Sequence, residues 1–285
     1  MTPTTLPHPL TGAAHPSPVP PGTGWPDDPA DPATPTAHGP EDVVSLAEGA
    51  TLAEVGARVS VCRACPRLVT WREDVAVAKR AAYAEEPYWG RPIAGWGDPA
   101  ARVLVVGLAP AAHGGNRTGR IFTGDRSGDW LFASLHRAGL ARTATSVHAG
   151  DGQELLGTRM VAAVRCAPPD NKPSTAERDT CAPWLHRELT LLAPTARVVL
   201  CLGSFGWAAA LRALAAIGYV VPRPRPRFGH GAEVVLEPGP GRPDLAPLVL
   251  LGSYHPSQQN TFTGRLTAEM LDAVTRRAAE LGRDG

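Results

Sequence analysis

Short apolar segments alternate with longer segments of helical character in the part of the chain after residue 100. The apolar segments predict strands at residues 103–108, 160–165, 198–202, 233–236 and 248–252. The other segments predict helices at residues 129–140, 174–192, 205–217 and 267–281. Helices that connect successive strands are typical of a parallel sheet covered on both faces. The alternation therefore predicts an α/β fold with three layers, α/β/α, around a mostly parallel central sheet.

The N-terminal part of the chain differs in composition from the rest. Pro, Thr, Ala, Gly and Asp dominate residues 1–40, and such a segment buries too little apolar surface to offset its chain entropy. We therefore predict a disordered tail over residues 1–40 and a single domain over residues 41–285. No apolar run approaches the ~18 residues of a membrane helix, and no signal peptide opens the sequence. We expect a cytoplasmic protein without a membrane partner, and we expect a monomer.

The most polar loops follow the predicted strands. The first of them is GLAPAAHGGNRTGRIFTGD at residues 107–125, and the next is CAPPDNKPS at residues 166–174. The two later strands lead into GSFGW at residues 203–207 and SYHPSQQNTFTGR at residues 253–265. Ligands of open α/β sheets bind at the carboxyl ends of the strands. These loops therefore predict one composite site.

Several kinds of site are excluded because their motifs are absent. The first loop has neither the phosphate-binding nor the dinucleotide-binding glycine pattern, and the chain has no nucleophile elbow. Basic and acidic residues nearly cancel, 28 against 27, so net charge argues neither for nor against a nucleic-acid partner. The remaining side chains suit hydrogen bonding to a small flat ligand, and they are His255, Asn171, Asp125, His113, Asn116 and Phe122.

Four of the five cysteines have the spacing of a ligand set. Cys62 and Cys65 form a C-x₂-C pair, and Cys166 and Cys181 follow about a hundred residues later. Four thiolates can bind zinc or a [4Fe-4S] cluster, and the spacing alone leaves both open. Four ordinary buried cysteines are the remaining interpretation. Cys201 lies inside a predicted strand and is interpreted as a small apolar core residue.

The two long motifs, GLAPAAHGGNRTGRIFTGD and HPSQQNTFTGRLT, together with the four cysteines, resemble family 5 of the uracil-DNA glycosylase superfamily. The resemblance covers roughly residues 41–285. It implies a [4Fe-4S] cluster in place of zinc. It also implies a base-excision-repair enzyme that flips a deaminated base out of DNA, hydrolyses its N-glycosidic bond and leaves an abasic site.

The resemblance also implies roles for individual residues. Phe122 would stack on the flipped base, and His255 would donate a hydrogen bond to its carbonyl oxygen. Asn171 matches the residue that holds the attacking water in the related family 4. Asp125 would act as a base, support the cationic sugar or brace its loop, and these alternatives remain open.

Further residues would shape the pocket or contact DNA. Gly107, Leu108 and Ala109 form part of the expected pocket floor. His113 and Asn116 would shape the pocket, touch phosphate or brace the loop. Gln258, Gln259 and Asn260 are candidates for filling the space left by the flipped nucleotide, and Arg265 is a candidate for binding phosphate. Arg223, Arg225 and Arg227 lie together on a loop that is interpreted either as a phosphate contact or as a solvated surface.

Two positions depart from the pattern of family 4. Leu108 replaces a carboxylate that handles water, and Ala162 replaces an amide that reads the pairing edge of uracil. A pocket with fewer polar groups discriminates less between bases, so we expect hypoxanthine, xanthine and modified cytosines as further substrates. No lysine is suitably placed for a Schiff base, which predicts a monofunctional glycosylase. The alternatives are a non-catalytic DNA-damage-binding protein and a hydrolase of free nucleosides.

Overall fold

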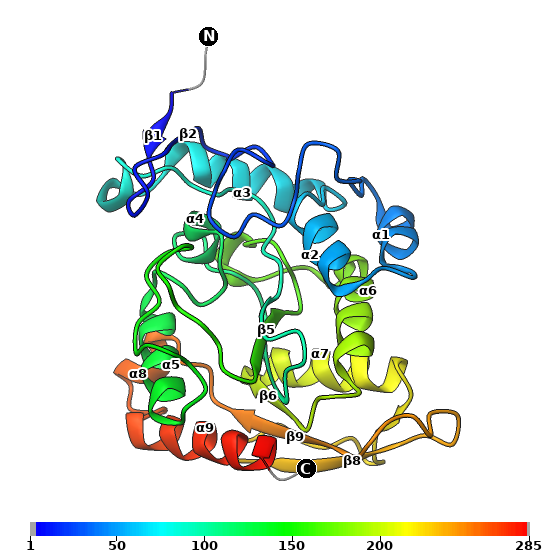
Figure 1. The fold of residues 1–285 in the computed structure, drawn as a ribbon. Coiled ribbons are helices and arrows are strands. Elements are labelled where there is room, and N and C mark those ends of the chain that lie inside the picture. Colours follow the sequence, from blue (N-terminus) through cyan, green and yellow to red (C-terminus); the bar gives the residue numbers. More distant parts are fainter. Residues whose placement is uncertain (1–3, 284–285) are drawn as a thin grey trace.

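A mixed seven-stranded sheet forms the centre of the computed structural model, which describes residues 4–283 (Figure 1). Its strands are, in spatial order, β3 (Trp96–Gly97), β5 (Thr158–Ala162), β4 (Val103–Gly107), β6 (Val198–Leu202), β9 (Leu248–Ser253), β8 (Glu233–Pro238) and β7 (Tyr219–Val220). Strands β5, β4, β6 and β9 are parallel, whereas β3, β8 and β7 pair antiparallel at the two edges. The predicted parallel centre of the sheet is confirmed.

Helices cover both faces of this sheet. Their bounds are α1 (Pro40–Ala47), α2 (Leu52–Ser60), α3 (Pro66–Ala78), α4 (Gly115–Thr118), α5 (Arg126–Arg137), α6 (Thr175–Leu192), α7 (Gly203–Ala216), α8 (Gln258–Phe262) and α9 (Ala268–Arg283), with 3₁₀ turns η1 (Ala81–Tyr83) and η2 (Pro169–Asn171). Helix α6 begins as predicted, because Ser174 Oγ accepts from the Glu177 amide and Glu177 Oε2 accepts from the Ser174 amide. Within residues 4–283 no helix is both long and apolar enough to cross a membrane.

The side chains of β4 explain the three layers. Val103 and Val105 belong to a buried cluster with residues of α5 and α9. Leu104 and Val106 belong to a second cluster with residues of α6 and α7. Alternate residues of a strand point to opposite faces, and all four are at most 2 % exposed. The predicted α/β/α fold is therefore confirmed, with one hydrophobic core on each side of the sheet.

Helices α1 and α2 add a small layer outside α6. Val43 of α1 and Val55 of α2 pack in one buried cluster with Trp184 of α6. In Figure 1 these two helices lie beside α6, and α3 runs across the top of the domain. This arrangement brings the first pair of cysteines, which lies between α2 and α3, next to α6.

The N-terminal segment is the main difference from the prediction of a disordered tail over residues 1–40. Val19 and Trp25 are 0 % and 3 % exposed, and Asp28 forms a buried ion pair with Arg91 at 2.9 Å. Strands β1 (Leu6–Pro7) and β2 (Ala14–His15) form a short hairpin. A few apolar anchors suffice for docking on an existing domain, because frequent prolines lower the entropy that the segment loses. Residues 1–3 and 284–285 lie outside the described part.

Candidate functional site

The loops after β4, β5, β6 and β9 meet around one cavity of about 770 Å³, which we call the main cavity. Parallel strands end at the same edge of a sheet, so these loops lie side by side as the sequence predicted. The residues of the predicted site that line the main cavity are Leu108, Ala109, Phe122, Asp125, Asn171, His255, Gln259, Asn260 and Arg265. The predicted composite site is therefore assembled in the structure.

Phe122 and His255 form the aromatic part of the main cavity. Their ring centroids are 5.8 Å apart and the ring planes are inclined by 38°. Phe122 has φ = +52°, a left-handed conformation that is strained for a bulky residue and tends to occur at functional sites. A Cβ atom at Gly107 would lie 2.9 Å from Cζ of Phe122. Only glycine at position 107 lets the ring lie this close to the end of β4.

The His255 ring is held in a neutral state. Burial lowers the pKa of His255 from 6.5 to about 4, because desolvation disfavours the imidazolium form. A neutral imidazole carries one N–H donor and one acceptor nitrogen. Asn260 Nδ2 donates to the His255 carbonyl oxygen at 2.8 Å and so fixes the backbone of this residue. No group within residues 4–283 hydrogen-bonds the ring itself, so the ring is free to bind a ligand.

Asn171 projects from a tight turn at the end of η2. Asp170 and Asn171 have φ = 51° and 55°, and Asn and Asp tolerate this left-handed conformation better than other residues with a Cβ atom. Asn171 is exposed and lines the main cavity. In the described part of the chain no protein group pairs with its side-chain amide. The amide is therefore available for a water molecule or a ligand.

Asp125 has a structural contact and faces the main cavity. Its Oδ1 accepts from the Gly128 amide at 2.9 Å and caps α5. Its Oδ2 lies against Gly114, where a Cβ atom would clash with it. Burial raises the pKa of Asp125, since desolvation exceeds the effect of the backbone hydrogen bonds. The geometry shows that Asp125 braces the loop and that its carboxylate borders the cavity.

His113 and Asn116 do not reach the main cavity. His113 Nδ1 pairs with the Tyr88 hydroxyl at 3.2 Å, and Asn116 Nδ2 donates to the Arg72 carbonyl oxygen at 3.1 Å. Of the roles that the sequence left open for them, the structure places both as braces of the loop. Neither residue lines the main cavity, and their expected contacts with DNA stay a prediction.

Known proteins resemble this chain in sequence over most of its length. The family model described as the uracil DNA glycosylase superfamily matches residues 94–279. The chain belongs to this superfamily. The type-5 uracil-DNA glycosylase of Mycobacterium bovis is 57 % identical over 275 residues, which cover 96 % of this chain and 98 % of the relative. The enzymes with the same name from Thermus thermophilus and Pyrobaculum aerophilum are 51 % and 46 % identical, and each match covers 78 % of this chain and 94 % or 89 % of the relative. The resemblance to family 5 is confirmed.

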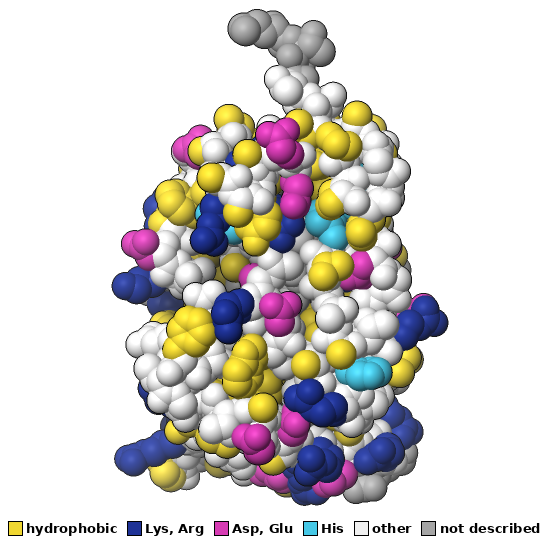
Figure 2. All heavy atoms as spheres, turned by 90° about the vertical axis from the view of Figure 1, so that its left-hand side faces the viewer, with side chains coloured by type: hydrophobic (Ala, Val, Ile, Leu, Met, Phe, Trp, Pro, Cys, Tyr) yellow, Lys and Arg dark blue, Asp and Glu magenta, His cyan; other side chains and the backbone are white. Residues whose placement is uncertain are grey.

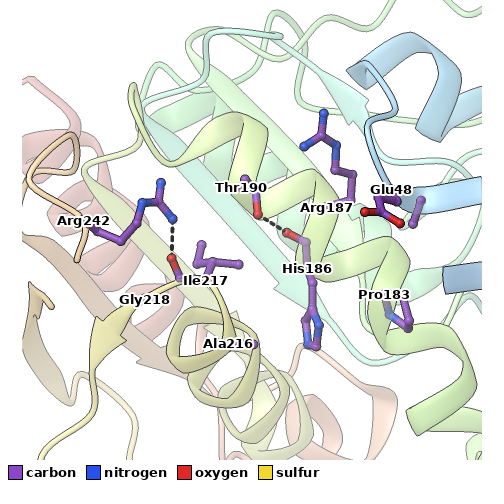
Figure 3. A pocket seen from close by; sticks show the side chains of 10 residues that line it. Glu48, Pro183, His186, Arg187, Thr190, Ala216, Ile217, Gly218 and Arg242 are labelled. Carbon is purple, nitrogen blue, oxygen red and sulfur yellow. Dashed lines mark hydrogen bonds between the residues drawn. The ribbon is translucent and has the colours of Figure 1, made fainter. Parts of the chain in front are cut away.

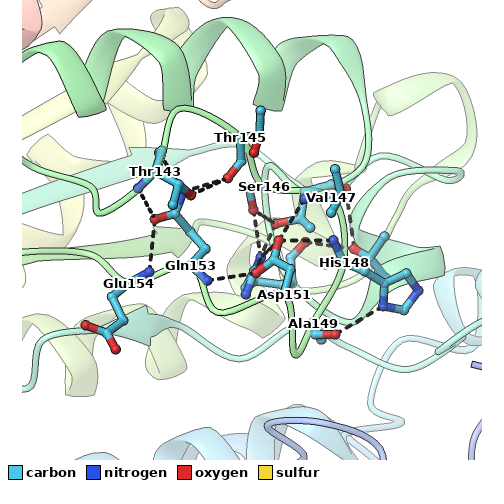
Figure 4. Close-up of polar contacts among 12 residues, drawn as sticks. Thr143, Thr145, Ser146, Val147, His148, Ala149, Asp151, Gln153 and Glu154 are labelled. Atoms are coloured by element: carbon cyan, nitrogen blue, oxygen red, sulfur yellow. Dashed lines mark hydrogen bonds and ion pairs between the residues drawn. The ribbon is translucent and has the colours of Figure 1, made fainter. Parts of the chain in front are cut away.

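A neighbouring loop, which the sequence analysis missed, is held by polar contacts centred on Asp151 (Figure 4). Asp151 accepts from Arg120 Nη2 at 2.6 and 2.7 Å and from the Val147 amide at 2.8 Å. The Ser146 carbonyl oxygen accepts from the Gly124 amide at 2.9 Å. These contacts hold the segment that contains Phe122. The contacts of Asp151 with Arg120 and of Ser146 with Gly124 join residues more than twenty positions apart, so no local motif indicates them.

Two arginine–aromatic pairs accompany the rim of the main cavity. The Arg126 guanidinium lies 4.8 Å from the Phe262 ring centroid, and Arg265 lies 4.8 Å from that of Tyr254. Phe262 is 66 % exposed. The face that carries α5 and α8 shows basic and hydrophobic side chains next to one another (Figure 2). Cationic and aromatic groups together are typical of surfaces that bind single-stranded nucleic acid. Sequence reasoning overlooked Arg126 and Phe262, although both adjoin the long motifs.

The four cysteines of the predicted ligand set line a second cavity, which we call the cysteine cavity. Cys62 and Cys65 precede α3, Cys166 follows β5, and Cys181 lies in α6. Burial raises the pKa of the Cys65 thiol to about 12, so only a bound cation would make it a thiolate at neutral pH. Within residues 4–283 no group of three or more His, Cys, Asp or Glu side chains could hold a metal ion. The four cysteines of the predicted set nevertheless line one cavity.

Polar groups around the cysteine cavity favour a negatively charged occupant. Arg72 Nη1 donates to Cys166 Sγ at 3.0 Å. Arg165 Nε and Nη1 and Trp184 Nε1 are buried donors without a hydrogen-bond partner in the described chain. Two of the buried guanidinium groups, those of Arg159 and Arg165, share one buried carboxylate, that of Glu188. A centre bound by four thiolates would supply both the missing acceptors and the missing negative charge.

A third cavity, of about 520 Å³, contains none of the predicted site residues (Figure 3). It lies between α1, α6 and the turn after α7, with His186 on its floor. Its arginines already have partners: Arg187 Nε donates to the Ala50 carbonyl oxygen at 2.6 Å, and Arg242 binds Asp244 and the Ile217 carbonyl. These groups leave little unmet binding capacity, so the cavity is not a candidate site.

Proposed function

We propose that the protein is a monofunctional DNA glycosylase that hydrolyses the N-glycosidic bond of flipped-out uracil and leaves an abasic site. The observation that carries the proposal is the main cavity, where the buried Phe122 ring, a neutral imidazole and a free amide face one space. The names of the relatives, type-5 uracil-DNA glycosylases, support this substrate. Flipping the nucleotide costs a few kcal/mol, and the cost is smallest for mismatched bases.

Phe122 and His255 would bind the extruded base. The base stacks on the Phe122 ring, and an N–H of the neutral His255 ring donates to a carbonyl oxygen of the base. Negative charge develops on this oxygen as the glycosidic bond breaks. A preorganised donor of this kind contributes about 3–4 kcal/mol at the transition state.

Asn171 and Asp125 would act on the side of the sugar. The Asn171 amide orients the attacking water but cannot take its proton, which suffices for a strongly electrophilic sugar cation. The Asp125 carboxylate borders the same cavity and stabilises that cation electrostatically. Because its Oδ1 already caps α5, this support comes from a carboxylate with a fixed position.

The loop after β9 would contact the DNA. Asn260 is already used to hold the His255 backbone, so Gln258 and Gln259 are the better candidates for filling the vacated space. Arg265 and Arg126 lie at the cavity and are suited to bind the flanking phosphates.

The cavity wall also suggests substrates beyond uracil. Leu108 lines the main cavity, and Ala162 is buried at the end of β5, so neither position offers a polar group to a base. A wall without these groups imposes a smaller penalty on other bases. We therefore extend the proposal to hypoxanthine, xanthine and modified cytosines. The only lysines, Lys79 and Lys172, do not line the cavity, in agreement with a glycosylase that forms no Schiff base.

We also propose that Cys62, Cys65, Cys166 and Cys181 hold a [4Fe-4S] cluster. The four cysteines line one cavity beside buried cationic side chains, which supports a negatively charged centre held by thiolates. When bound, the cluster supplies a structural crosslink between α3, the loop after β5 and α6. Iron and sulfide analysis of the purified protein tests this part, and one tightly bound zinc per chain would contradict it.

Treatment of a uracil-containing oligonucleotide with the protein and then with alkali tests the main proposal. We expect strand breaks only after alkali, and only at uracil. Binding without breaks would indicate a non-catalytic DNA-damage-binding protein. Release of uracil from free deoxyuridine but not from the oligonucleotide would indicate a nucleoside hydrolase. Strand breaks without alkali would contradict the monofunctional mechanism.

A further inference from the structure

Arg72 is a buried cation that touches the cysteine cavity directly. It is 1 % exposed, and its Nη1 donates to Cys166 Sγ at 3.0 Å and to the Cys62 carbonyl oxygen at 3.2 Å. Its Nε donates to the Gly90 carbonyl oxygen at 3.2 Å. The nearest carboxylate, that of Glu73, is 3.7 Å away. The position of the Arg72 side chain therefore depends on the occupant of the cysteine cavity.

Asn116 connects Arg72 to the loop that forms the main cavity. Asn116 is 1 % exposed, and its Nδ2 donates to the Arg72 carbonyl oxygen at 3.1 Å. Its own carbonyl oxygen accepts from the Gly90 amide at 2.9 Å. Arg72 and Asn116 thus share Gly90 as a neighbour, and α3 is joined to α4 by buried hydrogen bonds.

Arg117, the next residue, continues this connection to the catalytic end of the loop. Its Nη2 donates to the Gly124 carbonyl oxygen at 2.9 Å, and its Nε donates to the His113 carbonyl oxygen at 2.9 Å. Gly124 lies between Phe122 and Asp125, which both line the main cavity. Hydrogen bonds and the chain links between them therefore connect a cysteine sulfur with the segment that carries Phe122 and Asp125.

We propose that Arg72, Asn116 and Arg117 are positioning residues that make the geometry of the main cavity depend on the occupant of the cysteine cavity. The inference rests on the proposed function for its effect on catalysis. The strained conformation of Phe122 persists only while its surroundings hold it, and this connection is one of the supports that reach it. Loss of the proposed cluster would then loosen residues 107–125, which include Phe122 and Asp125 of the main cavity.

Hydrogen exchange of the full-length protein, measured by mass spectrometry, tests the connection without DNA. We expect Asn116→Ala to retain the metal content of the wild type, while amides in residues 107–125 exchange about tenfold faster, as for the loss of one buried hydrogen bond. We expect Arg117→Met, which breaks the series at its other end, to accelerate the same amides. On uracil-containing DNA both variants should lose kcat while KM changes little.

The control is Arg137→Gln, which removes a surface ion pair with Asp272 and lines neither cavity. It should change neither the exchange nor kcat. Removal of the metal from the wild type should accelerate exchange in residues 107–125 to the rate seen in Asn116→Ala. Removal of the metal from Asn116→Ala itself should accelerate exchange little further, because two changes that act through one connection are not additive. Unchanged exchange in Asn116→Ala, or fully additive effects, would overturn the proposal. Accelerated exchange in a protein that cleaves no uracil would leave the connection standing and contradict the proposed function instead.

Discussion

The main cavity and the cysteine cavity are built from equally distant parts of the chain, yet their side chains are held in opposite ways. In the main cavity the His255 ring and the Asn171 amide have no protein partner within the described residues, and the backbone is strained at Phe122. Around the cysteine cavity Arg72 and Glu188 are fully buried and bonded on several sides. The first arrangement leaves groups free for a substrate, and the second fixes a scaffold around an occupant.

This contrast separates the effects of mutations on activity from their effects on stability. A change of the His255 ring or the Asn171 amide removes an interaction that would exist only with the substrate, so the free protein loses little. A change at the cysteine cavity leaves buried charges and donors without compensation, which is costly in any state of the enzyme.

The largest expected effect is that of Cys166→Ser on stability. Loss of this thiol should release the proposed cluster and leave the Arg72 guanidinium without its sulfur acceptor. Losses of a structural metal are among the few single changes that cost about 4 kcal/mol or more. Thermal unfolding and metal analysis of the same sample measure both consequences.

Cys201→Ser is the matched control for this variant. Cys201 is also fully buried, but it lies in β6 and not at the cysteine cavity. The Cys201→Ser variant should keep the full metal content. Its free energy of unfolding should fall only by the modest amount expected for a polar atom in the core. Equal metal loss in both variants would show that the cysteine cavity has no special role.

The next effect is that of His255→Ala on catalysis. We expect kcat to fall by about 10²–10³, the usual loss for one transition-state donor, with an unfolding temperature close to that of the wild type. Steady-state kinetics on a uracil-containing oligonucleotide, next to a control variant of the exposed His38, measures the difference. A decrease in kcat of less than tenfold would show that His255 does not stabilise the leaving base.

The pH dependence sharpens this prediction. Because burial lowers the pKa of His255 to about 4, the ring stays neutral down to pH values well below 6.5. Protonation of this residue should therefore leave kcat unaffected between about pH 5.5 and 8 and should alter it only as the pH falls towards about 4. A step in kcat near pH 6.5 that disappears in His255→Ala would show that the ring is not desolvated as the structure indicates.

The sequence predicted the main cavity better than it predicted the surroundings of either site. His255 and Asn171 could be predicted because parallel strands end at one edge of the sheet, so polar loops after them must meet. Asn116 stands in the same motif as Phe122, but its direction depends on the short helix α4 and on Arg72. Arg72 itself could not be found, because its partners lie far away in the chain and no pattern marks them. The docked N-terminal segment escaped prediction for a similar reason, since its few anchors depend on a surface that only the folded domain provides.

The smallest effect is expected for Gly107→Ala, because Gly107 ends β4 and lies against the Phe122 ring of the main cavity. The new Cβ atom would meet the Phe122 ring at 2.9 and 3.1 Å, so the ring must shift by a few tenths of an ångström. We expect kcat/KM to fall about tenfold and stability to fall by about 1–2 kcal/mol, as for a small overpacking change. Gly241→Ala, which meets no atom within 4 Å, is the control.

The double variant Gly107→Ala/Phe122→Leu should regain stability because the shorter side chain leaves room for the methyl group, but it should not regain activity because the stacking surface is lost. If the double variant recovered both, Phe122 would only fill space, and the main cavity would lack its aromatic surface for a base.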